Sequence, residues 1–306
     1  MTAEMSARRC AVCEAVRVLP GSLCRFLLSQ DPRRQEGWEE IRLRAGRGLF
    51  ASGGDGAEER LTRDGQSVPI GAEDLRQTVE IATRASLQGA ADKLSAGFLP
   101  LPGGHRLGLC GTVTLREGHV LSVRTLSSLN LRIACPVTGI GEDLLPKLLV
   151  EGRFQSTLIL APPGEGKTTL LRDLIRLLGL RGVRTGLADE RGEVAALRGG
   201  VPQLDVGPLA DVLDGCPKGE GLLLLLRSMA PQVLAADEIT RPEDTAALCQ
   251  GANCGAALLA TAHGTDWDGL RRREVYRPLL EQRVFRRLVT IRREGGRRSY
   301  RVEELL

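Results

Sequence analysis

The stretch that most constrains the fold is TLILAPPGEGKTTLLRDLIRLL, residues 157–178. An apolar segment, TLILA, leads into a loop that contains Gly164 and Gly166, and leucine and isoleucine then recur at helical spacing. A strand that turns through glycines directly into a helix gathers backbone N–H groups and the positive end of the helix around one point. Such a point binds anions, so this stretch predicts a phosphate-binding loop.

The loop matches the Walker A pattern, G-x-x-x-x-G-K-[ST], except at its first position, where Ala161 replaces glycine. One methyl group is tolerable there because the close approach to phosphate occurs at Gly164 and Gly166. Lys167 is expected to reach the β- and γ-phosphates of ATP, and the hydroxyl of Thr168 to hold Mg²⁺. The expected nucleotide-binding residues are Ala161, Pro162, Pro163, Gly164, Glu165, Gly166, Lys167, Thr168 and Thr169.

Composition makes this lysine more informative. The chain has 42 basic residues, and only Lys93, Lys147, Lys167 and Lys218 among them are lysine. Wherever either cation would serve, this sequence nearly always has arginine. A lysine inside a glycine loop therefore indicates a compact point charge between phosphates, which a guanidinium does not provide.

Two acidic pairs follow apolar segments further along the chain. QVLAADEIT ends in Asp237-Glu238, the Walker B pattern, in which Asp237 is expected to hold Mg²⁺ and Glu238 to polarise the attacking water. GLADERGEV offers a rival pair, Asp189-Glu190, since the carboxyl ends of parallel strands meet at one edge of a sheet. We prefer Glu238 as the base because it lies beside the metal ligand. Glu190 stays a catalytic candidate, and the rival pair could instead coordinate water or brace the site.

LLATAHGTD delivers His263, one of three histidines, to the end of another apolar segment. A histidine at that edge can donate a hydrogen bond to the γ-phosphate and report its loss. The alternative interpretation is a histidine that caps the structure. We expect its strand to lie beside both the Walker A and the Walker B strands.

The first 140 residues mix helical and strand patterns and show no catalytic constellation, which indicates a small α+β assembly domain. The predicted elements are a helix over 11–30, a strand within 39–50, an exposed loop over 53–65, a helix over 72–94 broken at Gly89, and hairpin turns at 103–104 and 117–118.

The pattern changes between Pro136 and Glu142, and we expect domains at 1–140 and 141–306. In the second domain apolar strands alternate with helices, which is typical of a parallel sheet covered on both faces. The predicted fold class is α/β: a RecA-like P-loop NTPase core preceded by a smaller α+β domain. The predicted strands are 157–161, 185–188, 233–236 and 256–261, the helices 168–178, 222–229 and 243–253, and a closing hairpin turns at Gly295-Gly296.

Composition restricts the function classes. The longest apolar run, 221–226, is far shorter than the ~20 residues that cross a bilayer. Cys10-x-x-Cys13 has no second pair at ligand spacing, so reduced thiols are expected rather than a metal site. Aromatic residues make up only 3% of the chain, which argues against a RecA-like nucleic-acid motor that stacks bases. An ATP-gated scaffold with little turnover is the other alternative, against which the intact Asp237-Glu238 pair argues.

Together these motifs resemble the secretion-superfamily AAA-type ATPases, which drive type II and type IV secretion and pilus machines. Those enzymes place a Walker A, an acidic box, a Walker B and a histidine box in the order matched by 161–168, 189–193, 233–238 and 261–264. Further phrases resemble the stage III sporulation AA family in particular, over most of the chain. These are EIRLRAGR, GGHRLGLCG, SSLNLRIA, APPGEGKTTLLRDLIR, DERGEV, LLRSMAPQVLAADEIT and ATAHG.

The resemblance implies a homohexameric ATPase. The motifs themselves predict ATP and Mg²⁺ as its ligands, and the scarcity of aromatic residues predicts that it does not act on nucleic acid. It also implies a cytosolic protein of the mother cell, attached peripherally to the outer forespore membrane through the membrane proteins of a sporulation channel. By the same resemblance, Arg124 or Arg132 would complete the site of a neighbouring subunit. The arginine-rich segment 271–301 is either a docking surface or a plain solvated basic face.

Overall fold

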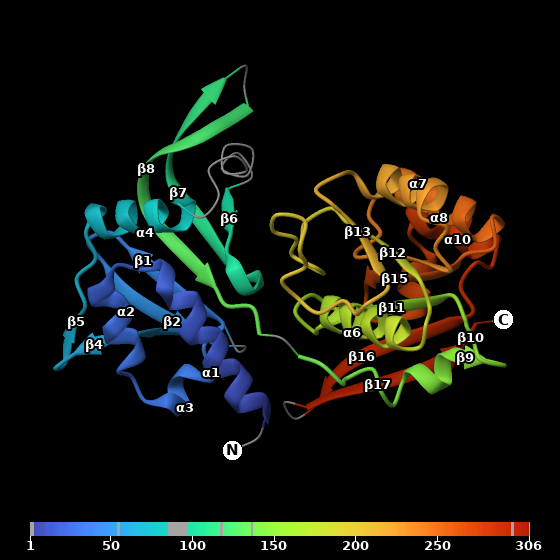
Figure 1. The fold of residues 1–306 in the computed structure, drawn as a ribbon, viewed down its shortest axis with the longest axis horizontal. Helices are drawn as coiled ribbons and strands as arrows, with labels where there is room; N and C mark the ends of the chain where they lie inside the picture. The colour runs from blue at the N-terminus through green and yellow to red at the C-terminus, as the bar shows by residue number, and fades with distance from the viewer. Residues whose placement is uncertain are drawn as a thin grey trace. The chain divides into compact units, whose positions relative to one another are not determined.

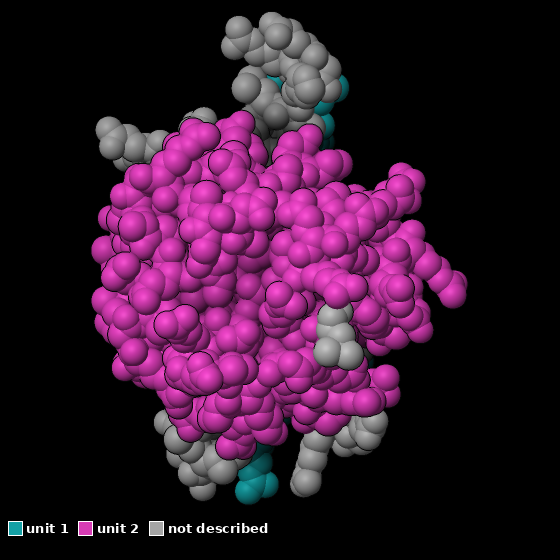
Figure 2. Space-filling model, turned by 90° about the vertical axis from the view of Figure 1, so that its right-hand side faces the viewer, with its two compact units in different colours: residues 1–136 teal, residues 137–306 magenta. Residues whose placement is uncertain are grey.

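The computed structural model describes all residues except 1–2, 54–55, 85–96, 117–118, 136, 295–296 and 306. The chain divides into two compact units, which are described separately: unit 1 is residues 1–136 and unit 2 is residues 137–306 (Figures 1 and 2). This division lies at the start of the segment 136–142, in which the sequence pattern changes. The sequence predicts the boundary four residues later, at residue 140.

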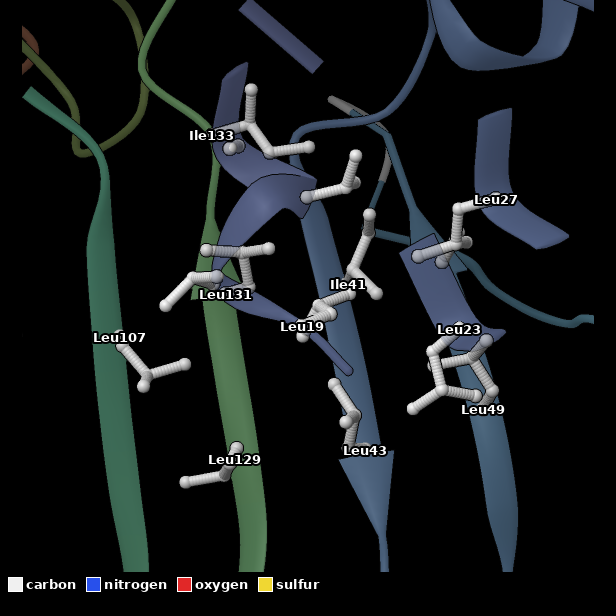
Figure 3. Packing of buried hydrophobic residues seen from close by; sticks show 14 of the residues in the cluster. Leu19, Leu23, Leu27, Ile41, Leu43, Leu49, Leu107, Leu129, Leu131 and Ile133 are labelled. Carbon is white, nitrogen blue, oxygen red and sulfur yellow. The ribbon is translucent and has the colours of Figure 1, made fainter. Parts of the chain in front are cut away.

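Unit 1 is an antiparallel sheet with helices packed on it. The strands lie in the order β3-β2-β1-β8-β7-β6. Figure 3 shows Leu19, Leu23 and Leu27 from the helical segment beside leucines and isoleucines of the strands, and these residues belong to one buried cluster. The strands are β1 Glu40–Arg44, β2 Gly48–Ser52, β3 Glu58–Arg60, β6 Phe98–Pro100, β7 Arg106–Arg116 and β8 His119–Arg132, with a separate hairpin of β4 Thr62–Arg63 and β5 Gln66–Ser67. The helices are α1 Ala3–Ala15, α2 Gly21–Leu28, α3 Pro32–Gln35 and α4 Ala72–Arg84, with short 3-10 turns at Val16–Val18 and Pro102–Gly104.

Two predicted elements of unit 1 differ from the structure. The single helix expected over 11–30 is wrong: α1 ends at Ala15 and α2 begins at Gly21. Pro20, which precedes α2 in an extended conformation, has no backbone N–H to continue a helix. The loop expected over 53–65 contains β3, which pairs with β2. Because the side chains of β3 are all exposed, its sequence carries no apolar alternation.

The remaining predicted helices, strands and turns of unit 1 are confirmed where the structure describes them. β1 occupies the predicted strand within 39–50, and α4 begins the predicted helix over 72–94. The second part of that helix, including Gly89, lies outside the described residues, as does the turn at 117–118. The turn at 103–104 lies between β6 and β7.

Unit 2 is built on a seven-stranded sheet in the order β13-β12-β14-β15-β11-β16-β17. All neighbouring pairs are parallel except the last, β16 with β17, so the predicted fold class is confirmed. The strands are β11 Thr157–Ala161, β12 Thr185–Asp189, β13 Ala210–Asp214, β14 Val233–Ala236, β15 Ala257–His263, β16 Arg287–Glu294 and β17 Arg297–Glu304. A small hairpin pairs β9 Leu149–Val150 with β10 Arg153–Phe154 after a 3-10 turn at Leu145–Leu148.

Helices cover both faces of this sheet. Residues of α6 share one buried cluster with the strands, and residues of α7, α8 and α10 share another. Every residue of β11, β12 and β14 is buried, as expected for strands enclosed on two sides. The helices are α6 Lys167–Leu180, α7 Lys218–Ser228, α8 Pro242–Asn253, α9 Trp267–Arg271 and α10 Arg277–Glu281, with a 3-10 turn at Glu274–Tyr276.

The sequence predicted the central elements of unit 2 to within a few residues. The edge strand β13 was missed, and its residues are only partly buried, so its apolar pattern is weak. The closing hairpin is confirmed by the antiparallel pairing of β16 with β17, while its turn at 295–296 lies outside the described residues.

Candidate functional site

The loop predicted to bind phosphate connects the end of β11 to the start of α6. Gly164 and Gly166 both have left-handed backbone conformations, with φ of 78° and 91°. Side chains strongly disfavour this region, so the loop depends on glycine at these two positions. Ala161 occupies the last position of β11 and is buried, and its carbonyl oxygen accepts a hydrogen bond from the backbone N–H of Gly264. The alanine at the first Walker position thus lies within the sheet rather than in the bend.

Lys167 is the first residue of α6, and its side chain is buried within the loop. Its ammonium donates to the carbonyl oxygens of Ala161 at 3.0 Å and Pro162 at 2.9 Å. Burial lowers the pKa of Lys167, against the opposing charges of Asp237, Glu238 and Glu165. The ammonium therefore lies in a poorly hydrated place where an anionic ligand would favour its charged form.

Thr168 joins the loop to the Walker B strand. Its hydroxyl donates to Asp237 Oδ2 at 2.6 Å, while the hydroxyl of Thr261, from β15, donates to Asp237 Oδ1 at 2.6 Å. Burial raises the pKa of Asp237, and the two hydroxyl hydrogen bonds oppose that shift. Burial of a carboxylate is costly, and a cation bound at this point would offset that cost.

These oxygens fit a magnesium ion. Mg²⁺ takes oxygen ligands and is usually held by one or two carboxylates together with phosphates and water, so Thr168 and Asp237 suffice as its protein ligands. In the described part of the chain, no group of three or more His, Cys, Asp or Glu side chains could enclose a metal ion. Cys10 and Cys13 are free cysteines.

Glu238 follows Asp237 in a left-handed conformation, with φ of 58°, which is uncommon for a residue with a side chain. Its backbone N–H donates to the hydroxyl of Thr261 at 2.8 Å. Its carboxylate forms an ion pair with Arg191 at 2.7 Å and a contact with Nε2 of His263. The strained turn therefore directs the carboxylate toward the histidine at the end of the neighbouring strand.

His263 lies between the lysine and the glutamate. Its strand, β15, pairs with β11 on one side and β14 on the other, as predicted. Nδ1 lies 2.8 Å from the ammonium of Lys167, which can only donate, so this contact favours the tautomer with the ring proton on Nε2, the atom that contacts Glu238. Lys167, His263 and Glu238 form one chain of contacts, which we call the K-H-E chain.

The rival acidic pair, Asp189-Glu190, has different partners. Asp189 is buried, and its carboxylate accepts hydrogen bonds from three backbone N–H groups of residues 193–195, the shortest at 2.8 Å. Glu190 forms ion pairs with Arg241 at 2.7 Å and with the buried ammonium of Lys218 at 3.3 Å. Each carboxylate has structural partners, and these contacts favour the bracing alternative for both.

Sequence reasoning missed three residues around this site: Thr261, Arg191 and Lys218. Only Lys218 carried a signal, because lysine is rare in this chain. Thr261 lies in an apolar strand, where a threonine is unremarkable, and Arg191 is one arginine among many. Arg172, on α6, donates to the carbonyl oxygens of Val194 and Glu193 instead of facing the loop.

The two arginines assigned by resemblance lie on β8 of unit 1. Arg132 forms an ion pair with Glu40 at 2.9 Å, and Arg124 is exposed. In the described ranges no helix combines the length and the apolar character that crossing a bilayer requires.

Comparison with known proteins gives two kinds of match. The model of the family "Sporulation stage III, protein AA" matches residues 11–302. The "Stage III sporulation protein AA" of Bacillus subtilis (strain 168) is 39% identical over 295 residues, covering 92% of each chain.

Solved structures of secretion and pilus proteins share the fold. The ATPase DotB of Legionella pneumophila superposes with a TM-score of 0.59 at 17% identity, covering 94% of this chain and 81% of DotB. The pilus retraction motor PilT, solved with bound ADP, gives a TM-score of 0.59 at 16% identity, covering 88% and 79%. At such low identity the likeness establishes the fold alone.

Proposed function

The chain belongs to the sporulation stage III protein AA family, and from that premise we propose that it is a Mg-ATP-hydrolysing motor of a secretion-like machine. The support comes from the edge of the unit 2 sheet, where a phosphate loop, a metal-binding carboxylate and a general base meet. The fold shared with the ATPase DotB and the motor PilT is consistent with this proposal.

One observation carries the proposal: the 2.6 Å hydrogen bond between the Thr168 hydroxyl and Asp237. The two residues come from distant parts of the sequence, and the fold places their oxygens together at the start of α6. Hard oxygen donors beside a phosphate loop are what Mg-nucleotide binding requires. An ordinary turn before a helix would not need a buried carboxylate at this point.

The residues of the site divide the work. The loop N–H groups and Lys167 bind the phosphates, and Thr168 and Asp237 hold the metal. Mg²⁺ held by these two residues would neutralise charge on the phosphates. Glu238 accepts a proton from the attacking water. His263 orients the Glu238 carboxylate before the reaction, and it orients the γ-phosphate during the reaction.

We further propose a homohexamer in which neighbouring chains complete each site. Charge on a transferred phosphoryl group is commonly stabilised by arginine. Arg172 donates to backbone carbonyl groups, so it does not serve here. Arg124 and Arg132 of unit 1 are the candidates for this contact, and an exposed position suits Arg124. To contact a phosphate, Arg132 would have to break its ion pair with Glu40.

The cellular role follows from the family in the same way. We propose that the protein works in the mother-cell cytosol, at the outer forespore membrane, and energises transport or assembly through a channel of sporulation membrane proteins. Its attachment to the membrane would be peripheral and through those partners, with no nucleic acid as substrate.

The decisive experiment measures ATP turnover and oligomeric state together, with and without nucleotide, over a range of protein concentrations. We expect Mg-dependent turnover whose rate per chain rises as hexamers assemble. Undiminished activity of a monomer at high dilution would contradict sites completed by neighbours. Stimulation by added nucleic acid would indicate a nucleic-acid motor, and binding without turnover would indicate an ATP-gated scaffold.

A further inference from the structure

The C-terminal hairpin brings arginines to the edge of the sheet that holds the phosphate loop. β16 runs parallel to β11, with Thr290 opposite Leu160, and continues past the end of β11 to Glu294. β17 pairs with it in the antiparallel direction, which makes Arg298 one of the first residues of β17. The sequence predicts that the arginine-rich segment 271–301 is either a docking surface or a solvated basic face.

Strand alternation decides which way Arg298 faces. Successive side chains of a strand point to opposite faces, so Arg298 shares a face with Tyr300 and Val302. Tyr300 and Val302 pack against the buried cluster that includes the core-facing residues of α6. Arg298 is therefore on the α6 side of the sheet, one step nearer the nucleotide edge than Tyr300.

The guanidinium of Arg298 lies directly against the loop. A Cβ placed on Gly166 would be 3.3 Å from both Cζ and Nε of Arg298 and 3.6 Å from Nη2. The left-handed φ of Gly166 favours glycine at this position, and the guanidinium lies within contact distance of it. Gly166 also precedes Lys167, so the arginine approaches the same part of the loop that offers N–H groups to a phosphate.

Two arginines lie opposite each other at this point of the hairpin. Arg298 lies opposite Arg293 in the register of β16 and β17, and like charges in directly opposed positions destabilise a sheet. Among the side chains that the structure describes, no carboxylate forms an ion pair with either arginine. The positive end of α6 adds to the same field. An anion bound at the loop would relieve this repulsion.

We propose that Arg298 binds the diphosphate part of the nucleotide, which ATP and ADP share, from within the same chain. Asp237 and His263 end strands on one side of β11, whereas the hairpin lies on the other side. The γ-phosphate end belongs with the acids and the histidine, so Arg298 faces the α- and β-phosphates. This inference rests on the proposed nucleotide site and adds a ligand that the motif does not contain.

The test is to measure ADP and ATP affinity calorimetrically for the wild-type protein, Arg298→Ala and Arg298→Lys. We expect Arg298→Ala to weaken both nucleotides by a similar factor, about tenfold, because one charge-assisted contact is lost from a group that both contain. Arg298→Lys should recover part of the affinity through its charge. Arg301→Ala is the matched control: it removes a charge from the opposite face of the same strand, where Arg301 pairs with Glu303 at 2.7 Å.

The outcomes separate the two proposals. A wild-type protein that binds neither nucleotide contradicts the proposed function itself. If the wild type binds but Arg298→Ala and Arg301→Ala both match it, the inference about Arg298 is wrong. A loss confined to ATP, with ADP affinity unchanged, would also overturn it, since the arginine would then act on the γ-phosphate. Thermal unfolding of each variant shows that the hairpin is still folded.

Discussion

Two acidic pairs occupy equivalent places in unit 2 and have different surroundings. Asp189 is the last residue of β12 and Glu190 follows it, Asp237-Glu238 follows β14, and the two strands are neighbours in the parallel sheet. The first aspartate accepts three backbone N–H groups of its own loop, whereas the second receives hydroxyl groups from the phosphate loop and from β15. A sequence pattern gives the position of an acid, and the partners of that acid indicate its role.

The two glutamates, Glu190 and Glu238, also differ in their partners. Glu190 lies between two cations, Lys218 and Arg241, both of which belong to the surrounding structure. Glu238 forms an ion pair with the exposed Arg191 and contacts His263, which in turn reaches Lys167. The difference is that one cation of Glu190, Lys218, is buried, whereas the cation beside Glu238 is exposed.

The largest expected effect compares Glu238→Gln with Glu190→Gln. Loss of a general base lowers turnover by about 10²- to 10⁴-fold, so Glu238→Gln should bind ATP and scarcely hydrolyse it. Glu190→Gln should keep turnover within a few-fold and unfold at a lower temperature. Steady-state phosphate release and nucleotide binding on the same preparations measure both. Normal turnover in Glu238→Gln with loss in Glu190→Gln would reverse the assignment.

The next effect concerns Lys167, the cation at the far end of the K-H-E chain. Lys167→Ala removes the charge that faces the β- and γ-phosphates, and we expect ATP affinity to fall by about a hundredfold. Lys218→Ala is the matched control, since it removes a buried lysine from the bracing pair instead. Titration with a fluorescent nucleotide distinguishes them: equal losses of affinity in the two variants would mean that the two acidic pairs are not distinct.

His263→Ala should have a smaller effect, on turnover more than on binding. Lys167, the metal and the loop amides carry most of the phosphate interaction, so affinity should stay within a few-fold. Turnover, or its coupling to the assembly, should fall by at least about tenfold, as for one lost transition-state hydrogen bond. Normal hydrolysis together with a melting temperature several degrees lower would identify His263 as a structural cap.

The smallest effects are on stability, and they have opposite signs. Asp189→Asn should destabilise the nucleotide-free protein by about 2 kcal/mol, because buried N–H groups lose a charged acceptor. Asp237→Asn should raise its melting temperature slightly, since burial makes the Asp237 carboxylate costly.

The pH dependence of Asp237 tests the same point. Its folded pKa is raised, so in the range between the unfolded and the folded pKa the folded state binds more protons. The free energy of unfolding therefore falls as pH rises through that range. Asp237→Asn should remove this pH dependence. Circular dichroism melts of both variants and wild type across mildly acidic to neutral pH measure it. A lower melting temperature for Asp237→Asn at neutral pH would contradict the interpretation.

The sequence predicted the parts of the site that follow from short patterns. Lys167, Thr168 and Asp237 each have a fixed place in a strand, loop or helix start, and the parallel sheet brings their ends together. Arg191 and Arg298 were not predictable in the same way. Their roles depend on where a loop and a return strand cross the edge, and arginine is too common here for its position to be informative.

The same limit applies to the fold. Buried strands such as β11 and β14 have apolar sequences and were found, whereas β3 and β13 lie at sheet edges with exposed or half-buried residues and were missed. The single helix predicted over 11–30 is the opposite kind of error, an element predicted where the structure has a break. The apolar spacing continues across Pro20, but the helix does not.

The position of β11 in the sheet has a consequence for how unit 2 acquires its structure. β7 and β8 are consecutive in the chain and can pair locally, but Thr157 of β11 lies opposite Leu259 on one side and Arg287 on the other. Closing such long stretches of chain costs entropy before any contact repays it, so pairings of this kind slow folding. We therefore expect the strand that carries the phosphate loop to be among the last parts of the chain to gain its neighbours. A newly made chain would then have β7 and β8 paired while β11 still lacks its neighbours, and protection of β11 amides from hydrogen exchange would appear late in refolding.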